Sequence, residues 1–334
     1  MTPEEALAEA AQAGIHCLPI PTPFLVGRVN CYLIEDEPLT LVDCGPNSGK
    51  ALDELERALA AHGRTVEQLE LIVVTHQHID HIGLVEVLAR RSGAEVAALD
   101  RLSGYLGDFR RATELDDEFA AALMLRHGIP EDVVQALRSV SSAFRGWGSG
   151  TTVTRPLGDG TRLALRDRTL EVLHRPGHSP SDTVFWDAER RILLGGDHLI
   201  KHISSNPLVA RPLDDGEAGA RPQALRTYIA SLTATRALPA RTVLAGHGEP
   251  VTDHAALIDE RFALTERRAR KVHALLGDGP LTAHEVAQRM WGNVAVTQAF
   301  LTLSEVLGHL DLLCEQGVVR EHDDDGVVRF ESTA

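Results

Sequence analysis

The stretch LIVVTHQHIDHIG, residues 71–83, decides the fold. Its continuous apolar start predicts a strand buried on both faces, and three histidines and an aspartate follow this strand directly. His76 and His78 alternate along an extended turn and can face one centre. Asp80 and His81 lie where a helix should begin, and they can face a second centre. A lone histidine is more often an ordinary buried or surface residue, but four such residues in the pattern HxHxDH predict a site for zinc or a related divalent metal.

Further ligand candidates stand at the ends of three other apolar runs. They are His178 in HRPGHSPSD (174–182), Asp197 in LLGGDH (193–198) and His247 in LAGHGEP (244–250). Each lies near glycines, whose missing side chains let the backbone pass close to a metal. Ligands at strand ends fit the crevice in which α/β sheets bind their ligands.

Short apolar runs bounded by turn residues predict a mixed α/β chain with two successive sheet-forming halves. The first half has helical patterns at 50–62 and 83–91, and strands at 30–34, 39–45, 71–74 and 95–99. The second half has strands at 151–157, 161–165, 169–174, 183–187, 191–196 and 242–246. Residues 101–148 between the two halves are charged and helical in pattern, so they predict an inserted helical cap.

The length indicates one main domain with an appendage, because 334 residues exceed the roughly 250 at which single cores stop growing. We expect the main domain to cover residues 1–256 and the tail to cover 257–334. The tail has a long helical pattern, then helices at 282–291 and 297–315, then a hairpin that turns at Asp325-Gly326. This order is typical of a winged helix.

The chain is acidic, with 33 basic residues against 48 acidic ones and a formal net charge of −15. Such a surface repels phosphate backbones. The helix at 297–316 would enter a DNA groove in a winged helix, yet it has no lysine or arginine to bind phosphates and bases. We therefore expect no nucleic-acid partner. We interpret the tail as a packing or dimerisation module, so a homodimer is one possible state of the protein.

The four cysteines form no CxxC pair, so neither a disulfide framework nor a cysteine-based zinc site is indicated. The amino terminus is acidic and lacks the pattern of a signal peptide, and no apolar run approaches the roughly 20 residues that span a bilayer. These features predict a cytoplasmic protein without a membrane partner.

The ordered motifs HxHxDH, PGH, GGD and GHG resemble those of the metallo-β-lactamase superfamily, specifically its glyoxalase II-like and lactonase-like branch, over residues 15–256. The resemblance implies an αββα sandwich with a helical insertion and a C-terminal winged-helix domain. It also implies two divalent metal ions, with zinc expected and iron or manganese as alternatives. Their ligands would be His76, His78 and His178 for the first metal, Asp80, His81 and His247 for the second, and Asp197 as the bridge. Asp43 matches a position whose carboxylate orients a ligating imidazole.

The same resemblance implies a hydrolase in which a hydroxide shared by the two metals attacks the carbonyl of a thioester, lactone or ester while Asp80 orients it. His78 stands where redox members of the fold carry a carboxylate, and Asp197 stands where true β-lactamases have no aspartate. Both residues favour hydrolysis of acyl bonds other than β-lactams. One alternative is a phosphodiesterase or nuclease that uses the same centre. Another is a non-enzymatic regulator with structural metals.

The residues predicted to contact the substrate lie in three segments. Lys201 and His202 follow Asp197, Arg175 precedes His178, and Phe24 lies in the loop 21–30, which resembles a family loop that overhangs the metals. They suggest a medium-sized acyl substrate with an apolar body and an anionic or strongly polar end, which Lys201 would bind. Solvent exposure of the charged groups and simple burial of Phe24 are the alternatives.

Overall fold

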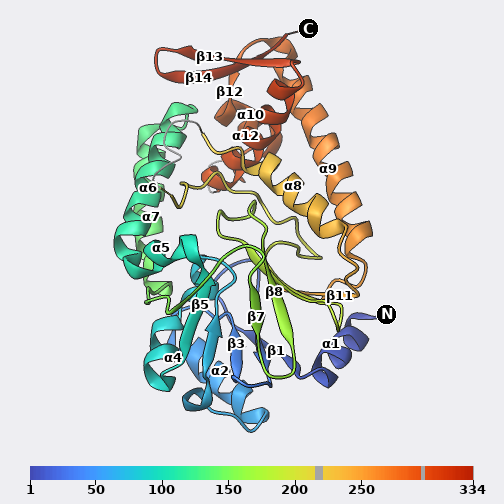
Figure 1. Ribbon diagram of the computed structural model, residues 1–334. Helices are drawn as coiled ribbons and strands as arrows, with labels where there is room; N and C mark the ends of the chain where they lie inside the picture. Colours follow the sequence, from blue (N-terminus) through green and yellow to red (C-terminus); the bar gives the residue numbers. More distant parts are fainter. Residues whose placement is uncertain (215–220, 295–297, 334) are drawn as a thin grey trace.

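The structure, a computed structural model, describes residues 1–214, 221–294 and 298–333, and it is built on two β-sheets that pack against each other (Figure 1). The first sheet has the strand order β1-β2-β3-β4-β5-β6 and the second has the order β11-β10-β9-β8-β7. The strands of the first sheet are β1 Ile15–Ile20, β2 Val29–Ile34, β3 Thr40–Val42, β4 Leu71–Val73, β5 Glu95–Leu99 and β6 Arg155–Leu157. Those of the second are β7 Arg162–Ala164, β8 Thr169–His174, β9 Thr183–Asp187, β10 Ile192–Gly196 and β11 Thr242–Ala245.

Strand direction places several carboxyl ends along one edge of the molecule. Strands β3 to β6 are parallel to one another, and β10 is parallel to β11, whereas the other neighbouring strands of the two sheets are antiparallel. The carboxyl ends of parallel strands meet at the same edge of a sheet. The segments that follow β4, β10 and β11 are therefore available for one site.

Apolar side chains from the two sheets pack together between them, and helices cover both outer faces. The shared core includes Ile34, Val73, Val172, Phe185 and Leu244. Helices α2 Gly49–Ala61 and α4 Val85–Ser92 contribute to the core on the outer face of the first sheet. Helices α8 Ala224–Arg236 and α9 His254–Leu275 do the same for the second sheet. The predicted α/β class, with two packed sheets between helices, is confirmed.

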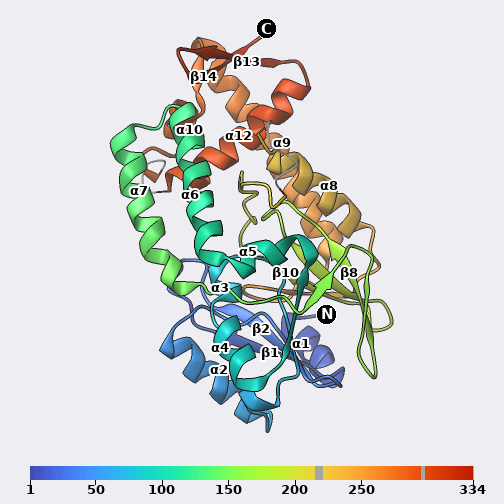
Figure 2. The same ribbon diagram turned by 60° about the vertical axis from the view of Figure 1, so that its left-hand side comes forward.

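The predicted cap is helical. It consists of η2 Asp100–Leu102, α5 Ser103–Gly107, α6 Phe109–Arg126, α7 Glu131–Phe144 and η3 Arg145–Trp147. Figure 2 shows α6 and α7 rising from the sheets toward the tail. Leu123, Met124 and Val134 of the cap share one hydrophobic cluster with Leu303 and Leu310 of the tail. The cap is thus fastened to the tail as well as to the sheets.

The tail combines helices with a small sheet of order β12-β14-β13. After α9 and η5 Leu276–Asp278 it contains β12 Leu281–Thr282, α10 Ala283–Trp291, α12 Ala299–Glu315, β13 Val319–Asp324 and β14 Val327–Ser332. The helix expected at 297–316 corresponds to α12, and residue 297 lies outside the described residues. The hairpin turns at Asp325 (φ 50°) and Gly326 (φ 86°), as a turn with two left-handed residues requires.

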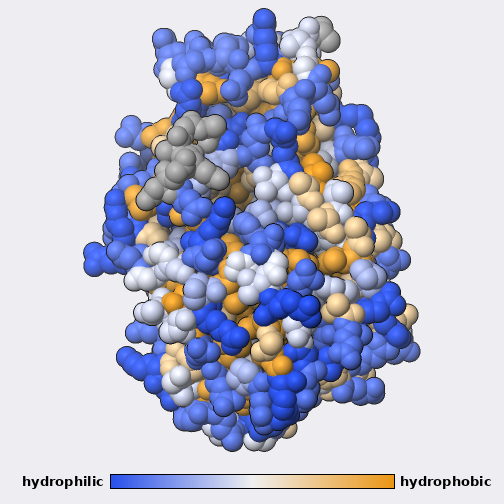
Figure 3. Space-filling view, in the orientation of Figure 1, coloured by the Kyte–Doolittle hydropathy of each residue, from blue (hydrophilic) through white to orange (hydrophobic). Residues whose placement is uncertain are grey.

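The surface drawn in Figure 3 is mainly hydrophilic, with apolar residues in small scattered groups. Helix α1 Pro3–Gln12 and the short helices η1 Val66–Gln68 and α3 Ile79–Ile82 complete the described elements. Within the described residues, no helix combines the length and apolar character needed to cross a membrane.

Candidate metal centre

The structure brings the seven predicted ligand residues together at the ends of four strands. His76 and His78 follow β4, and Asp80 and His81 lie in α3 directly after them. The other three are His178 between β8 and β9, Asp197 after β10 and His247 after β11. Three clusters have ligand atoms close enough to share an ion: His76 with His78 and His178, His76 with His81 and Asp197, and Asp80 with His81 and His247.

The first cluster is a convergence of three ring nitrogens. His76 Nε2 lies 3.0 Å from His78 Nδ1, and His178 Nε2 lies 2.9 Å from the same atom. An imidazole nitrogen without a proton carries a lone pair, and three such lone pairs directed at one point repel unless a cation lies between them. This arrangement fits a divalent metal.

The cluster of Asp80, His81 and His247, called the second cluster below, adds a carboxylate to two histidines, and Asp197 lies between it and the first cluster. His247 Nε2 lies 3.4 Å from Asp80 Oδ2 and 3.4 Å from Asp197 Oδ2. Asp197 Oδ1 lies 3.4 Å from His81 Nε2, and its Oδ2 lies 3.7 Å from His178 Nε2. Asp197 therefore faces histidines of both clusters, as a residue shared between two ions must.

Hydrogen bonds to the outer nitrogens orient these imidazoles. His81 Nδ1 donates to Asp43 Oδ2 at 2.8 Å, and His247 Nδ1 donates to the Arg28 carbonyl at 2.8 Å. On the inner side, His81 Nε2, His247 Nε2 and Asp197 Oδ1 are buried without a hydrogen-bond partner among the described residues. Fixing one ring nitrogen as the donor leaves the other free to bind a metal. The residues present thus fit the metal ions that the sequence predicts.

Burial and charge divide the histidines into two kinds. Burial lowers the pKa of His76 well below its usual value and lowers the pKa of His78 to about 3. Burial also acts to lower the pKa of His247, but Asp197 and Asp80 outweigh it and raise this pKa to about 9. Asp197 and Asp43 likewise raise the pKa of His81 well above its usual value against the effect of burial. Protons therefore occupy the second cluster when no metal does, and a divalent ion must displace them.

Glycines at two points allow the close approach that the site needs. A Cβ on Gly246 would lie 2.2 Å from Asp197 Oδ1, and a Cβ on Gly83 would lie 2.4 Å from the Trp147 carbonyl. A side chain at Gly246 would therefore collide with the shared carboxylate. One at Gly83 would push away the end of the cap.

A polar link that no sequence motif identifies joins the two loops that carry the first cluster. The Gln77 backbone N–H donates to Ser181 Oγ at 3.2 Å, and the Ser181 hydroxyl donates to Gln77 Oε1. Beside it, Asp182 accepts hydrogen bonds from the Ser179 backbone and hydroxyl at 2.9 and 2.8 Å. Burial raises the pKa of Asp182 to about 6. The only signal in the sequence is the polar run that follows His178.

Replacing Ser181 with alanine should weaken metal binding by about tenfold, because supporting residues around metal ligands contribute roughly 10- to 100-fold to affinity or activity. The measurement is competition with a chromophoric chelator. Ser304→Ala is the matched control, since Ser304 is also buried and hydrogen-bonded, to Val209 of the segment packed on the tail. Equal metal affinities in the two variants would contradict a role for the Gln77–Ser181 link.

The residues predicted to contact the substrate are spread around this centre. Lys201 Nζ lies 2.7 Å from Glu249 Oε2, with 47% of the lysine side chain exposed, so it forms a surface ion pair. His202 lies against Gly248, the neighbour of His247. Arg175 Nη1 donates to the carbonyl of residue 174 at 2.9 Å. The ring of Phe24 lies 5.8 Å from that of Phe144 in the cap.

Two sheets packed between helices, with histidines and aspartates converging from the strand ends, define a metal-binding hydrolase architecture. The chain belongs to the metallo-beta-lactamase superfamily, whose model matches residues 25–247. A second model, for the metallo-beta-lactamase-like C-terminal domain, matches residues 269–333. By family the protein is therefore a metallohydrolase that binds metal ions.

Three known proteins illustrate the similarity. A probable metallo-hydrolase of Bacillus subtilis is 33% identical over 94% of this chain and 96% of its own length. An acyl-coenzyme A thioesterase of Bos taurus is 32% identical over 51% of this chain and 58% of its own length. A metallo-beta-lactamase family protein from Thermus thermophilus has a solved structure that superposes with a TM-score of 0.79 at 30% identity, covering 96% of this chain and 98% of its own.

Proposed function

We propose that the protein hydrolyses thioesters, with lactones and activated esters as related substrates, at a two-metal centre of the glyoxalase II-like kind. The observation that carries this proposal is the position of Asp197 between the two ligand clusters, which makes two adjacent sites from one set of residues. Two divalent ions, for which zinc suits the imidazole and carboxylate donors, would polarise a carbonyl and lower the pKa of a water toward about 7.

Asp80 is placed to hold the attacking water. Burial acts to raise the pKa of Asp80, but its contact with His247 outweighs this effect and keeps the pKa below its usual value. The carboxylate is therefore ionised at neutral pH and accepts a hydrogen bond. By accepting it, Asp80 would orient the attacking water.

The cysteines support a reaction without a protein nucleophile. Burial raises the pKa of Cys17 and of Cys314 to about 11, and it raises the pKa values of Cys31 and Cys44 well above their usual value. Because the thiolate is the nucleophilic form, these four groups are inert at neutral pH. The similarity to an acyl-coenzyme A thioesterase favours the thioester among the acyl substrates.

The end of the cap is placed to contact the acyl group. The Asn47 backbone N–H donates to the Trp147 carbonyl at 2.7 Å, and Gly148 packs against Ile79, the neighbour of His78. Phe144 precedes this segment and contacts Phe24. This aromatic pair would bind the apolar body of the substrate. Lys201 and His202 would lie toward its polar end.

The decisive experiment is a substrate panel on the metal-loaded protein, with acyl-CoA, acyl-glutathione, lactone and phosphodiester compounds assayed side by side. We expect kcat/KM to be highest for a medium-chain acyl thioester. Turnover of the phosphodiesters alone would replace the proposal with the phosphodiesterase alternative.

Phe24→Ala should raise KM for a medium-chain acyl thioester by about tenfold, because losing an aromatic contact with the acyl chain removes roughly 1–2 kcal/mol of binding. The KM for an acetyl thioester should change little, since its acyl group is too short for the pair. Steady-state kinetics on both substrates checks this prediction. Phe119→Ala, which changes the cap where it packs against the cap–tail cluster, is the control. An equal rise in KM for both substrates would show that Phe24 only supports the fold.

The alternative of a nuclease receives no support from the tail, which we propose is a winged helix used for packing. Most of α12 is buried, and its three carboxylates are paired, Glu305 with Arg268, Asp311 with Arg221 and Glu315 with Arg226. This burial and pairing support a packing role for α12. The proposed partner is a small acyl molecule in the cytoplasm.

The protein should accordingly show no salt-sensitive affinity for duplex DNA at micromolar concentration. Fluorescence anisotropy of a labelled duplex, titrated between about 50 and 200 mM salt, provides the measurement. A steep loss of binding with added salt would overturn the packing role of the tail.

A further inference from the structure

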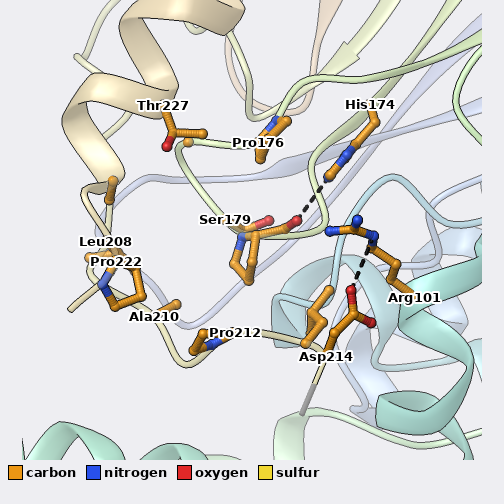
Figure 4. A pocket seen from close by; sticks show the side chains of 14 residues that line it. Arg101, His174, Pro176, Ser179, Leu208, Ala210, Pro212, Asp214, Pro222 and Thr227 are labelled. Atoms are coloured by element: carbon orange, nitrogen blue, oxygen red, sulfur yellow. Dashed lines mark hydrogen bonds and ion pairs between the residues drawn. The ribbon is translucent and has the colours of Figure 1, made fainter. Parts of the chain in front are cut away.

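A pocket with a volume of about 240 Å³ lies against the loop that carries His178 (Figure 4). Pro176, Gly177, Ser179 and Pro180 of this loop form one wall, while His178 itself turns toward His78. None of the seven ligand residues is among the described residues that line the pocket. The pocket is therefore separate from the metal centre, although the two share a loop.

The body of the pocket is apolar and stiff. Leu208, Ala210, Pro212 and Leu213 line it from the segment after Asp197, and Pro222 and Ala224 line it at the start of α8. With Pro176 and Pro180, four of the lining residues are prolines, whose fixed φ angles keep the walls in place. A preformed apolar wall lowers the ordering cost that a ligand must overcome.

One side of the pocket is polar and carries a cation with unused donors. In Figure 4 the Arg101 guanidinium lies between His174 and Asp214, and its Nε is 3.3 Å from Asp214 Oδ2. Neither Nη group donates a hydrogen bond to any described residue. His174 Nε2 donates to the Pro180 carbonyl at 2.9 Å. Burial, and then the charge of Arg101, lower the pKa of His174, so this imidazole is neutral at pH 7 and Arg101 is the cation available to a ligand.

The volume limits the ligand to a small molecule. A dry cavity of roughly 150 Å³ admits benzene, so about 240 Å³ admits one substituted ring or a medium-length aliphatic chain. We propose that this pocket binds an amphipathic carboxylate, with its apolar body among the prolines and its carboxylate on the Nη groups of Arg101. A carboxylate is the planar acceptor that the guanidinium fork matches.

The test is calorimetric titration of the full-length, metal-loaded protein with octanoate and with 1-octanol, which has the same chain without the charge. We expect octanoate to bind about tenfold more tightly, because a hydrogen bond to a charged group is worth about that much in affinity. Arg101→Gln should remove this preference and leave octanol binding unchanged. Arg57→Gln, which alters another exposed arginine paired with an aspartate, should change neither affinity.

Variants that fill the pocket distinguish binding in the pocket from binding at the metal centre, because metal ions also attract carboxylates. Thr227 lines the pocket from an exposed position on α8, so Thr227→Trp should fold normally and weaken both ligands by more than about tenfold. Ala210→Phe provides a second obstruction from the segment that follows Asp197. If octanoate binds equally to the wild type, Arg101→Gln and both filled variants, or binds to none of them, the proposal is wrong. The test measures binding alone, so its outcome is independent of the proposed hydrolysis.

Discussion

Replacing Asp80 with alanine should lower kcat for the preferred acyl substrate by more than about a hundredfold, beyond the range found for residues that only support metal ligands. The variant removes a carboxylate from the second cluster and, with it, the acceptor proposed to hold the water. Neither function has a substitute nearby, because the other carboxylate of the centre, Asp197, is already shared between the two clusters. The fall should appear in kcat more than in KM, because the contact between Asp80 and the attacking water contributes to the transition state and not to substrate binding.

Asp311→Ala is the matched control for this loss. Asp311 is as buried as Asp80, with 6% of the residue exposed against 8%, but it pairs with Arg221 beside the tail. Its removal should lower the melting temperature and leave kcat unchanged. Metal content must be measured in both variants. A metal-loaded Asp80→Ala protein with a kcat near that of the wild type would exclude the proposed role.

Removing the metals should lower the melting temperature by roughly 10–20 °C, because each of two ions at 100 times its dissociation constant contributes about 2.7 kcal/mol and a large domain shifts by about 2–4 °C per kcal/mol. Elemental analysis of the loaded protein should give close to two equivalents per chain. A content near one, unchanged by added zinc, manganese or iron, would contradict the two-metal centre.

The pH dependence of metal binding follows from His247. In the metal-free protein its pKa is about 9, so a metal must displace a proton from it at any lower pH. Metal affinity should therefore rise as the pH increases from about 6 to 9, and the metals should be lost progressively as the pH falls. Chelator competition at a series of pH values tests this sign. An affinity that is flat or falls over that range would show that His247 carries no proton in the metal-free state.

Much of the fold could be predicted because most strands are apolar runs that end in turn residues. Strand β1 is an exception, since its proline and its exposed positions break the apolar run. Helix α8 is another, because serine, threonine and alanine dilute the apolar face formed by Leu225, Tyr228 and Leu232. The core that joins cap and tail could not be predicted either, since neither helical segment reveals its partner on its own.

The ligand positions could be predicted because each is tied to the end of a strand by local sequence. The contacts that orient them are not local. The Arg28 carbonyl and His247 are 219 positions apart, and Gln77 and Ser181 are 104 positions apart. Lys201 is a further case of a non-local contact, because its partner Glu249 is 48 positions away and no pattern near Lys201 predicts this pairing. Residue type predicts that a side chain can bind an anion, but only the fold determines whether a carboxylate of the protein already occupies that side chain.

The seven candidate metal ligands come from segments of both sheets, and this has a consequence for the order in which a newly made chain matures. His76 and His81 leave the ribosome long before His247, which lies near the end of the second sheet. Until the second half has been synthesised and has docked, the nascent chain has only an incomplete and flexible set of ligands. Tight loading with metal must therefore follow the meeting of the two halves, a slow event because it joins distant parts of the sequence. Retention of metal by a newly synthesised chain would mark the moment at which its folding is complete.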